Sequence, residues 1–177
     1  MSLPYPAHLT STWQAADGER VTIRPIRPED AGIEQAFVKA LSPEAKYFRF
    51  MSSLNELTPA MLARFTQVDY DQEMALIAVV PEGAGERQIG VGRYVIDPGG
   101  ESCEFALVVA QAWQGRGLGR HLMTRLIELA RARGVAVMRG EILAANAGML
   151  ALVADLGFTV EDAPDAPGVK QAALALR

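Results

Sequence analysis

Residues 104–133, EFALVVAQAWQGRGLGRHLMTRLIELARAR, hold a strand, a glycine-rich turn and a long helix in direct succession. Residues 105–109 are apolar and rich in β-branched side chains, which predicts a buried strand, and the polar break from Gln111 to Gln114 ends it. From Leu118 on, leucines recur at helical spacing on one face, whereas His121 falls on the polar face and is expected to contact solvent. The stretch therefore predicts an amphipathic helix whose first turn is the glycine loop.

The turn combines three glycines at alternate positions with two arginines. It consists of Gln114, Gly115, Arg116, Gly117, Leu118, Gly119 and Arg120. The first amide N–H groups of a helix have no partner inside the helix, and the macrodipole adds partial positive charge at that end. Glycines let a phosphate approach the backbone, and arginines add cations. We therefore interpret the loop as a cradle for a pyrophosphate, ahead of the alternative that its glycines serve only tight packing.

The loop does not match two common nucleotide-binding motifs. A nucleoside triphosphatase loop would end in Gly-Lys-Ser/Thr, whereas this chain has Gly119-Arg120-His121. A dinucleotide-binding loop would need a third glycine where Arg120 stands, although Glu141, at the end of the next predicted strand, matches its ribose-binding acid. A dinucleotide-binding protein therefore stays as a weaker alternative.

The pattern Gln114-x-x-Gly117-x-Gly119 resembles the coenzyme A pyrophosphate loop of the GNAT superfamily of acyl-CoA-dependent N-acyltransferases. The resemblance covers nearly all of the chain from Val21 to Leu176. It is closest to the acetyltransferase domain of bacterial protein lysine acetyltransferases. Outside the loop it is most specific in residues 70–76 (YDQEMAL), 104–109 (EFALVV) and 140–146 (GEILAAN).

Composition limits the number of domains and the kinds of partner. The chain has 177 residues, 50% of them hydrophobic, which suffices for one buried core but not for two ordinary domains. We expect a loose lead-in over residues 1–18 and a single GNAT-like domain over residues 19–177. The net charge of −4 argues against nucleic acid as a partner, and no apolar run is long enough for a membrane span. One cysteine and two histidines leave no credible metal site. A cytoplasmic location is the default, and a homodimer stays open.

Hydrophobic periodicity predicts an α/β fold with a mixed sheet. An opening strand at residues 20–26 is followed by helices, two of which begin at Ser42-Pro43 and Thr58-Pro59, where an N-cap precedes a first-turn proline. The strands that follow are expected at residues 74–80, 88–96, 102–109, 135–143 and 171–176. Short turns make the first three an antiparallel meander, and a helical crossover makes the third and fourth the one parallel pair. We expect helices on both faces, including one at residues 146–155.

The resemblance implies transfer of an acetyl group from acetyl-CoA to a primary amine, on a protein lysine or a small molecule, by direct attack in a ternary complex. An alkylammonium of pKa about 10.4 has no free lone pair at neutral pH, so a base must remove a proton. Glu104 lies in the strand before the loop, and a glutamate at the matching position is the general base in similar lysine acetyltransferases. Glu141, Asp71 and Glu73 are reserve candidates. Cys103 is expected to be structural.

The resemblance also implies roles for other positions. Backbone N–H groups around Val108 and Val109 would meet the acyl oxyanion, and the pantetheine arm would enter between two splayed strands. Asn146 would cap its helix and contact pantetheine. Many relatives carry a tyrosine as general acid where this chain has Val153, so the thiolate would take its proton from solvent or leave as the anion. A catalytically silent acyl-CoA-binding or scaffold module is the alternative function.

Overall fold

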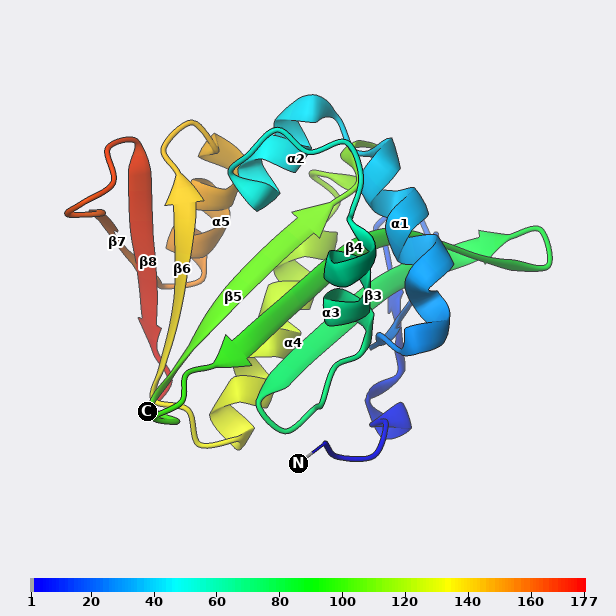
Figure 1. Ribbon diagram of the computed structural model, residues 1–177, viewed down its shortest axis with the longest axis horizontal. Coiled ribbons are helices and arrows are strands. Elements are labelled where there is room, and N and C mark those ends of the chain that lie inside the picture. Colours follow the sequence, from blue (N-terminus) through cyan, green and yellow to red (C-terminus); the bar gives the residue numbers. More distant parts are fainter. Residues whose placement is uncertain (1) are drawn as a thin grey trace.

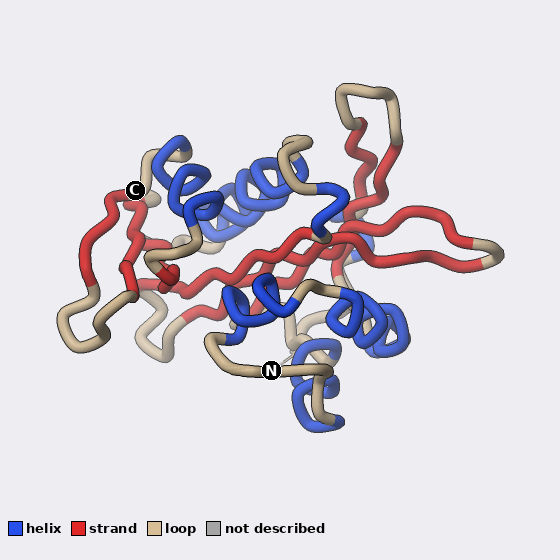
Figure 2. The backbone as a smooth tube through the Cα atoms, turned by 90° about the horizontal axis from the view of Figure 1, so that it is seen from above, coloured by secondary structure: helices blue, strands red, loops and turns tan. Residues whose placement is uncertain are grey.

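The computed structural model describes residues 2–177, which form one eight-stranded sheet with helices on both faces (Figure 1, Figure 2). The strands are β1 (Ser11–Gln14), β2 (Arg20–Pro25), β3 (Glu73–Glu82), β4 (Gly85–Ile96), β5 (Ser102–Val109), β6 (Val137–Leu143), β7 (Thr159–Asp162) and β8 (Val169–Ala175). The helices are α1 (Ala31–Ala40), α2 (Pro43–Phe50), α3 (Pro59–Thr66), α4 (Leu118–Ala132) and α5 (Ala147–Asp155), with single turns η1 (Ala7–Leu9), η2 (Pro28–Asp30) and η3 (Gln111–Trp113). Within residues 2–177, no helix is both long and apolar enough to cross a membrane.

The strand order is β1-β2-β3-β4-β5-β6-β8-β7, and β5 with β6 is the parallel pair. The predicted meander of β3, β4 and β5 is confirmed, since each pairs antiparallel with the next. The predicted helix starts are also confirmed. Ser42 accepts a hydrogen bond from the Ala45 amide at 3.1 Å, and Thr58 accepts one from the Met61 amide at the same distance.

The core lies on both faces of the central strands. Consecutive residues of β3, such as Leu76 and Ile77, point to opposite faces of the sheet and belong to two different clusters of buried side chains. One cluster lies under α4, whose Leu118 and Leu122 are fully buried, and the other lies under α1 and α3. Strand β3 is therefore apolar at successive positions, because both of its faces are covered. Figure 2 shows the two helical layers on opposite sides of the sheet.

Two strands at the ends of the sheet differ from the sequence-based expectation. The prediction of a loose lead-in over residues 1–18 was wrong for β1, which pairs antiparallel with β2 from Ser11 to Gln14. Strand β7 was not predicted and pairs antiparallel with β8. Both are four-residue edge strands of mostly half-buried or exposed residues. Because they bury so little apolar surface, their sequences lack the hydrophobic pattern that identified the inner strands.

The parallel pair separates soon after it begins. Hydrogen bonding joins only Ser102–Glu104 to the stretch from Val137 to Arg139. Farther on, β5 continues beside β4 and β6 beside β8, and Figure 1 shows the two strands diverging in a V. The Phe105 ring lies so close to Gly140 that a Cβ atom there would overlap it. The splay implied by the family resemblance is thus present, and its vertex lies beside Glu104.

The contact between Phe105 and Gly140 can be tested through stability. Gly140→Ala should lower the free energy of unfolding by about 1–3 kcal/mol, because the added methyl group forces the ring or β6 to move. Urea unfolding measures this difference. Gly148→Ala in α5 is the matched control, since its Cβ would meet no atom within 4 Å. That change should leave stability equal or raise it by up to ~1 kcal/mol. Equal stability of Gly140→Ala and the parent would contradict the close contact.

Candidate active site

The glycine loop presents an array of backbone amides. Gly115 and Gly117 have φ values of 74° and 92°, in the left-handed region that favours glycine, and Gly117 is the residue directly before α4. From Gly115 to Arg120, no main-chain N–H donates a hydrogen bond to another atom of residues 2–177. Unpaired amides at a helix start form a site for an anion. The loop therefore fits a pyrophosphate group.

The polar side chains of the loop already have partners. The side-chain amide of Gln114 donates a hydrogen bond to the Val109 carbonyl at 3.0 Å, which fixes the end of β5. Arg116 donates to Asp17 at 2.6 Å and lies 4.0 Å from the centroid of the Trp113 ring. Arg120 donates to Asp155 at 2.9 Å. The two predicted cations are therefore present, but both are neutralised by carboxylates that the sequence did not reveal.

Other loop and helix residues have structural surroundings. A Cβ atom on Gly119 would contact Leu107 and Val109 at 3.5 Å and 3.7 Å, so this glycine faces the sheet. The Asn146 side chain accepts a hydrogen bond from the Met149 amide at 3.2 Å, which confirms it as the N-cap of α5. Val108 is buried and Val109 half-buried in the part of β5 that has no strand partner on its β6 side.

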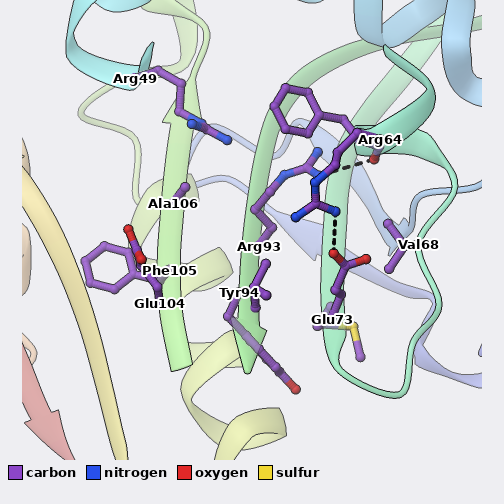
Figure 3. A pocket seen from close by; sticks show the side chains of 12 residues that line it. Arg49, Arg64, Val68, Glu73, Arg93, Tyr94, Glu104, Phe105 and Ala106 are labelled. Carbon is purple, nitrogen blue, oxygen red and sulfur yellow. Dashed lines mark hydrogen bonds and ion pairs between the residues drawn. The ribbon is translucent and has the colours of Figure 1, made fainter. Parts of the chain in front are cut away.

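A cavity of about 320 Å³ opens between the sheet and the helices α2 and α3, and Figure 3 shows its side chains. It is lined by Arg49, Arg64, Phe65, Val68, Glu73, Met74, Arg93, Tyr94, Val95, Glu104, Phe105 and Ala106. The predicted base Glu104 is thus in the cavity, together with one reserve candidate, Glu73. Asp71 and Glu141 are not among the lining residues.

The surroundings of the candidate bases differ. Glu104 is exposed and forms no ion pair or side-chain hydrogen bond within residues 2–177. Partial enclosure of its carboxyl group, followed by the charges of Glu141 and Asp97, raises its pKa. Glu73 is paired with Arg64 at 2.6 Å, and Asp71 with Arg133 at 2.8 Å. The hydrogen bond from Arg133 is the main reason for the lowered pKa of Asp71, which makes it a weaker base.

Three arginines of the cavity were missed by sequence reasoning. Arg93 lies on β4 and contacts Glu34 of α1 at 3.2 Å, and Glu34 is only 2% exposed. Arg93 also donates to the Phe65 carbonyl at 3.2 Å. A charged residue within an apolar strand, and another on the buried face of a helix, are signals that could have identified this pair. Arg49 and Arg64 stand on short helices whose sequence gives no such signal.

Three further expectations concern residues outside the cavity. The expectation that His121 contacts solvent was wrong, because it is half-buried and stacks on Trp13 of the unpredicted strand β1. Its Nε2 is buried with no hydrogen-bond partner in residues 2–177, and burial lowers the pKa of the ring.

Cys103 is 1% exposed, and burial raises the pKa of its thiol to about 12, as expected of a structural cysteine. Val153 is fully buried and offers no proton.

Comparisons with known proteins agree on one family. The model of the acetyltransferase (GNAT) family matches residues 41–158. Acetyltransferase PA5475 of Pseudomonas aeruginosa is 40% identical over 84% of this chain and 80% of its own length. Acetyltransferase Pat of Mycolicibacterium smegmatis is 32% identical over 81% of this chain, which spans only 43% of Pat. The crystal structure of the GNAT domain of S. lividans PAT matches with a TM-score of 0.86 and 31% identity, over 97% of this chain and 99% of that domain.

The chain therefore belongs to the acetyltransferase (GNAT) family. Its activity is that of an acetyl-CoA-dependent N-acetyltransferase, with acetyl-CoA as co-substrate. The loop amides and the divergence of β5 from β6 fit this coenzyme. Residues 2–177 contain no group of three or more His, Cys, Asp or Glu side chains placed to hold a metal ion.

The anion cradle can be tested at Gly117. Gly117→Val forces a β-branched residue to φ 92°, which should displace the loop and lower the affinity for coenzyme A at least ~10-fold, a loss of about 1.4 kcal/mol. Calorimetric titration measures it. Gly134→Val is the matched control, because Gly134 has φ 82° beyond the other end of α4. It carries a similar strain away from the loop. Equal coenzyme affinity of the two variants would contradict the cradle.

Proposed function

We propose that Glu104 is the general base in acetyl transfer from acetyl-CoA to a primary amine of a protein lysine or a small molecule. The observation that carries this proposal is the position of Glu104. It is an unpaired carboxylate that lines the cavity and occupies the last paired position of β5 before β6 diverges. A base placed there faces an acceptor in the cavity on one side and a coenzyme arm between the strands on the other. The reserve carboxylates Glu73 and Asp71 are paired with arginines.

The coenzyme is assigned to the loop and the gap between the strands. The backbone amides from Gly115 to Arg120 would hold the pyrophosphate, with Gln114 fixing the end of β5. Backbone N–H groups near Val108 and Val109 would donate to the acetyl oxygen as negative charge develops on it. Asn146 would add a contact to the pantetheine arm while it caps α5. Acetyl-CoA supplies the acetyl thioester.

The acceptor arrives as an ammonium ion at neutral pH, so proton removal is part of the reaction. Glu104 takes one proton, directly or through a water, and frees the nitrogen lone pair. The nitrogen then bonds to the acetyl carbonyl carbon and loses a second proton to solvent or to the leaving sulfur, the carbon–sulfur bond breaks, and the products are an amide and coenzyme A. A raised pKa makes Glu104 a stronger base in its ionised form than an ordinary glutamate.

The thiolate leaves without a tyrosine acid in α5, because Val153 occupies that place and is fully buried. A thiol of pKa about 8.5 is a tolerable leaving group as the anion, or takes a proton from solvent. We also propose a cytoplasmic location, which is supported by the one cysteine being free and buried. A silent acyl-CoA-binding module would share the loop, but it has no need for an unpaired carboxylate in the cavity.

The role of Glu104 predicts the behaviour of its isosteric variant. Glu104→Gln should lower kcat at pH 7 by roughly 10²-fold or more, because the amide cannot accept the ammonium proton. Coenzyme affinity should stay within about twofold. Raising the pH should partly restore the rate, since more of the amine is then already neutral. Steady-state rates of thiol release against pH test this. A variant as fast as the parent, with the same pH profile, would exclude Glu104 as the base and leave Glu141, Asp71, Glu73 or solvent.

The charge of Glu141 gives a second test. Glu141 raises the pKa of Glu104, so Glu141→Gln should lower that pKa. Because Glu104 must be ionised to act, the acidic limb of kcat/KM should move to lower pH, while rates above the limb change little. The control is Glu161→Gln, an exposed residue of β7. Near-complete loss of activity in Glu141→Gln at every pH would instead make Glu141 the base.

A further inference from the structure

The charged side chains that line the cavity form ion pairs, with two exceptions. Arg93 is paired with Glu34 at 3.2 Å, and Arg64 with Glu73 at 2.6 Å. Gln88 also donates to Glu34 at 3.0 Å, so both oxygens of that carboxylate have donors. Each of these acids is therefore neutralised by a neighbouring arginine. The two charged lining residues left over are a cation, Arg49, and an anion, Glu104.

Arg49 has no anionic partner among residues 2–177. It belongs to α2, is half-buried, and lies 4.9 Å and 5.6 Å from the ring centroids of Phe50 and Phe65. The salt bridges and hydrogen bonds of the described residues do not include it. In Figure 3 its guanidinium group hangs from α2 into the cavity. A guanidinium presents five N–H donors in a planar fork, and aromatic rings satisfy none of them as an acid would.

The position of Arg49 is costly without a ligand. Burial, followed by repulsion from Arg93, lowers the pKa of Arg49 to about 10. A second arginine nearby makes the region positive, so an anion placed beside Arg49 would offset both effects. Glu104 shows the opposite imbalance, because enclosure and then the charges of Glu141 and Asp97 raise its pKa more than the charge of Arg49 lowers it. One end of the cavity thus favours an anion and the other a cation.

The residue of β5 that lies between the levels of these two groups has a small side chain. Residues 104 and 106 project from the same side of β5, since side chains alternate along a strand. Figure 3 shows the small Ala106 side chain on β5 between the level of Arg49 and that of Glu104. The cavity of about 320 Å³ is also lined by Phe65, Val68 and Met74. Its volume is at the lower end of the range for small-molecule sites, about 300–1,000 Å³.

We infer that the acceptor is an amine that also carries a carboxylate, bound with the carboxylate on Arg49 and the amine facing Glu104. A free amino acid has this chemistry, and so does a carboxylate-bearing residue next to an acceptor amine in a peptide. The inference rests on the proposed function, because it assumes that Glu104 faces the reacting amine. It adds the substrate class that family membership leaves open. Arginine is suited to the role because its fork can bind both carboxylate oxygens.

The test uses acceptors matched except for the carboxylate. Acetyl transfer is measured for amino acids such as phenylalanine and lysine, for the amines that lack their carboxylates, and for a short peptide whose lysine lies beside an aspartate or an alanine. The parent should prefer the carboxylate-bearing member by about 10- to 100-fold in kcat/KM, the range expected for a charge-assisted bidentate contact. The amino acids and the peptides distinguish the two sources of the carboxylate.

Variants assign the preference to one residue. Arg49→Met keeps the apolar stem and should lower kcat/KM for the carboxylate-bearing member about 10- to 100-fold more than for its partner. Arg49→Lys keeps the charge but not the fork, so the preference should be partly retained. Arg87→Met is the matched control, because it removes the same charge from an exposed place on β4 outside the cavity lining. Far-UV circular dichroism and thermal melts confirm that each variant is folded.

The outcomes separate the inference from the function on which it rests. The inference is wrong, and the proposed function stands, if the parent acetylates amines with no preference for a carboxylate. The same holds if Arg49→Met lowers kcat/KM equally for both acceptors of a matched pair. If the parent acetylates none of these amines, the proposed function fails for this panel. Calorimetric titration of the parent and Arg49→Met with phenylalanine then decides about Arg49. Binding that depends on Arg49 supports the carboxylate site, and no binding to either protein refutes it.

Discussion

The short parallel pairing of β5 with β6 is the constraint on which the site depends. Pairing ends at Glu104 and Arg139, and beyond it each strand keeps only its outer neighbour. Backbone polar groups that lose a strand partner must bond to something else, and an extended ligand with amide groups can take that place. The same divergence sets Glu104 at the vertex. The opening for a coenzyme and the position of the proposed base are therefore consequences of one geometric feature.

Ion pairing between α1 and the sheet, on the same face as the cavity, helps to keep the cavity in shape. Glu34 is almost fully buried. Loss of its partner Arg93 would strongly destabilise the folded protein, because an unpaired buried charge costs several kcal/mol. The pair ties α1 to β4, while the Arg93 contact with the Phe65 carbonyl ties β4 to α3. Helix α2 is held differently. No buried residue belongs to it, so Arg49 is attached to a less firmly packed wall. A wall of this kind can adjust to the acceptor with little loss of core packing.

Sequence reasoning reached the parts of the fold that local patterns determine. Strand β5 was predicted with its observed limits, and Ser42-Pro43 and Thr58-Pro59 marked two helix starts, because these signals lie within a few consecutive residues. The edge strand β1 was not predicted, because it is stabilised by pairing with β2 rather than by burial of an apolar face. In the candidate site, the glycine loop and Glu104 were predicted from the sequence, and Glu104 lines the cavity. Arg49 was not predicted, because nothing in the sequence of its short helix marks it, and Arg93 was not, because its charge within an apolar strand was not read as the sign of a buried partner, and that partner, Glu34, lies far away in the chain.

The N-terminal hairpin shows how such distant pairings change the chemistry of a motif. Asp17, in the turn between β1 and β2, receives a hydrogen bond from Arg116 at 2.6 Å, and Trp13 packs near Gly117. A phosphate that reaches the loop must compete with the Asp17 carboxylate for Arg116, just as it competes with Asp155 for Arg120. Both ion pairs are partly exposed, so exchanging one anion for another changes the free energy little. The backbone amides have no protein acceptor to give up, and we therefore expect them, more than the arginines, to determine anion affinity.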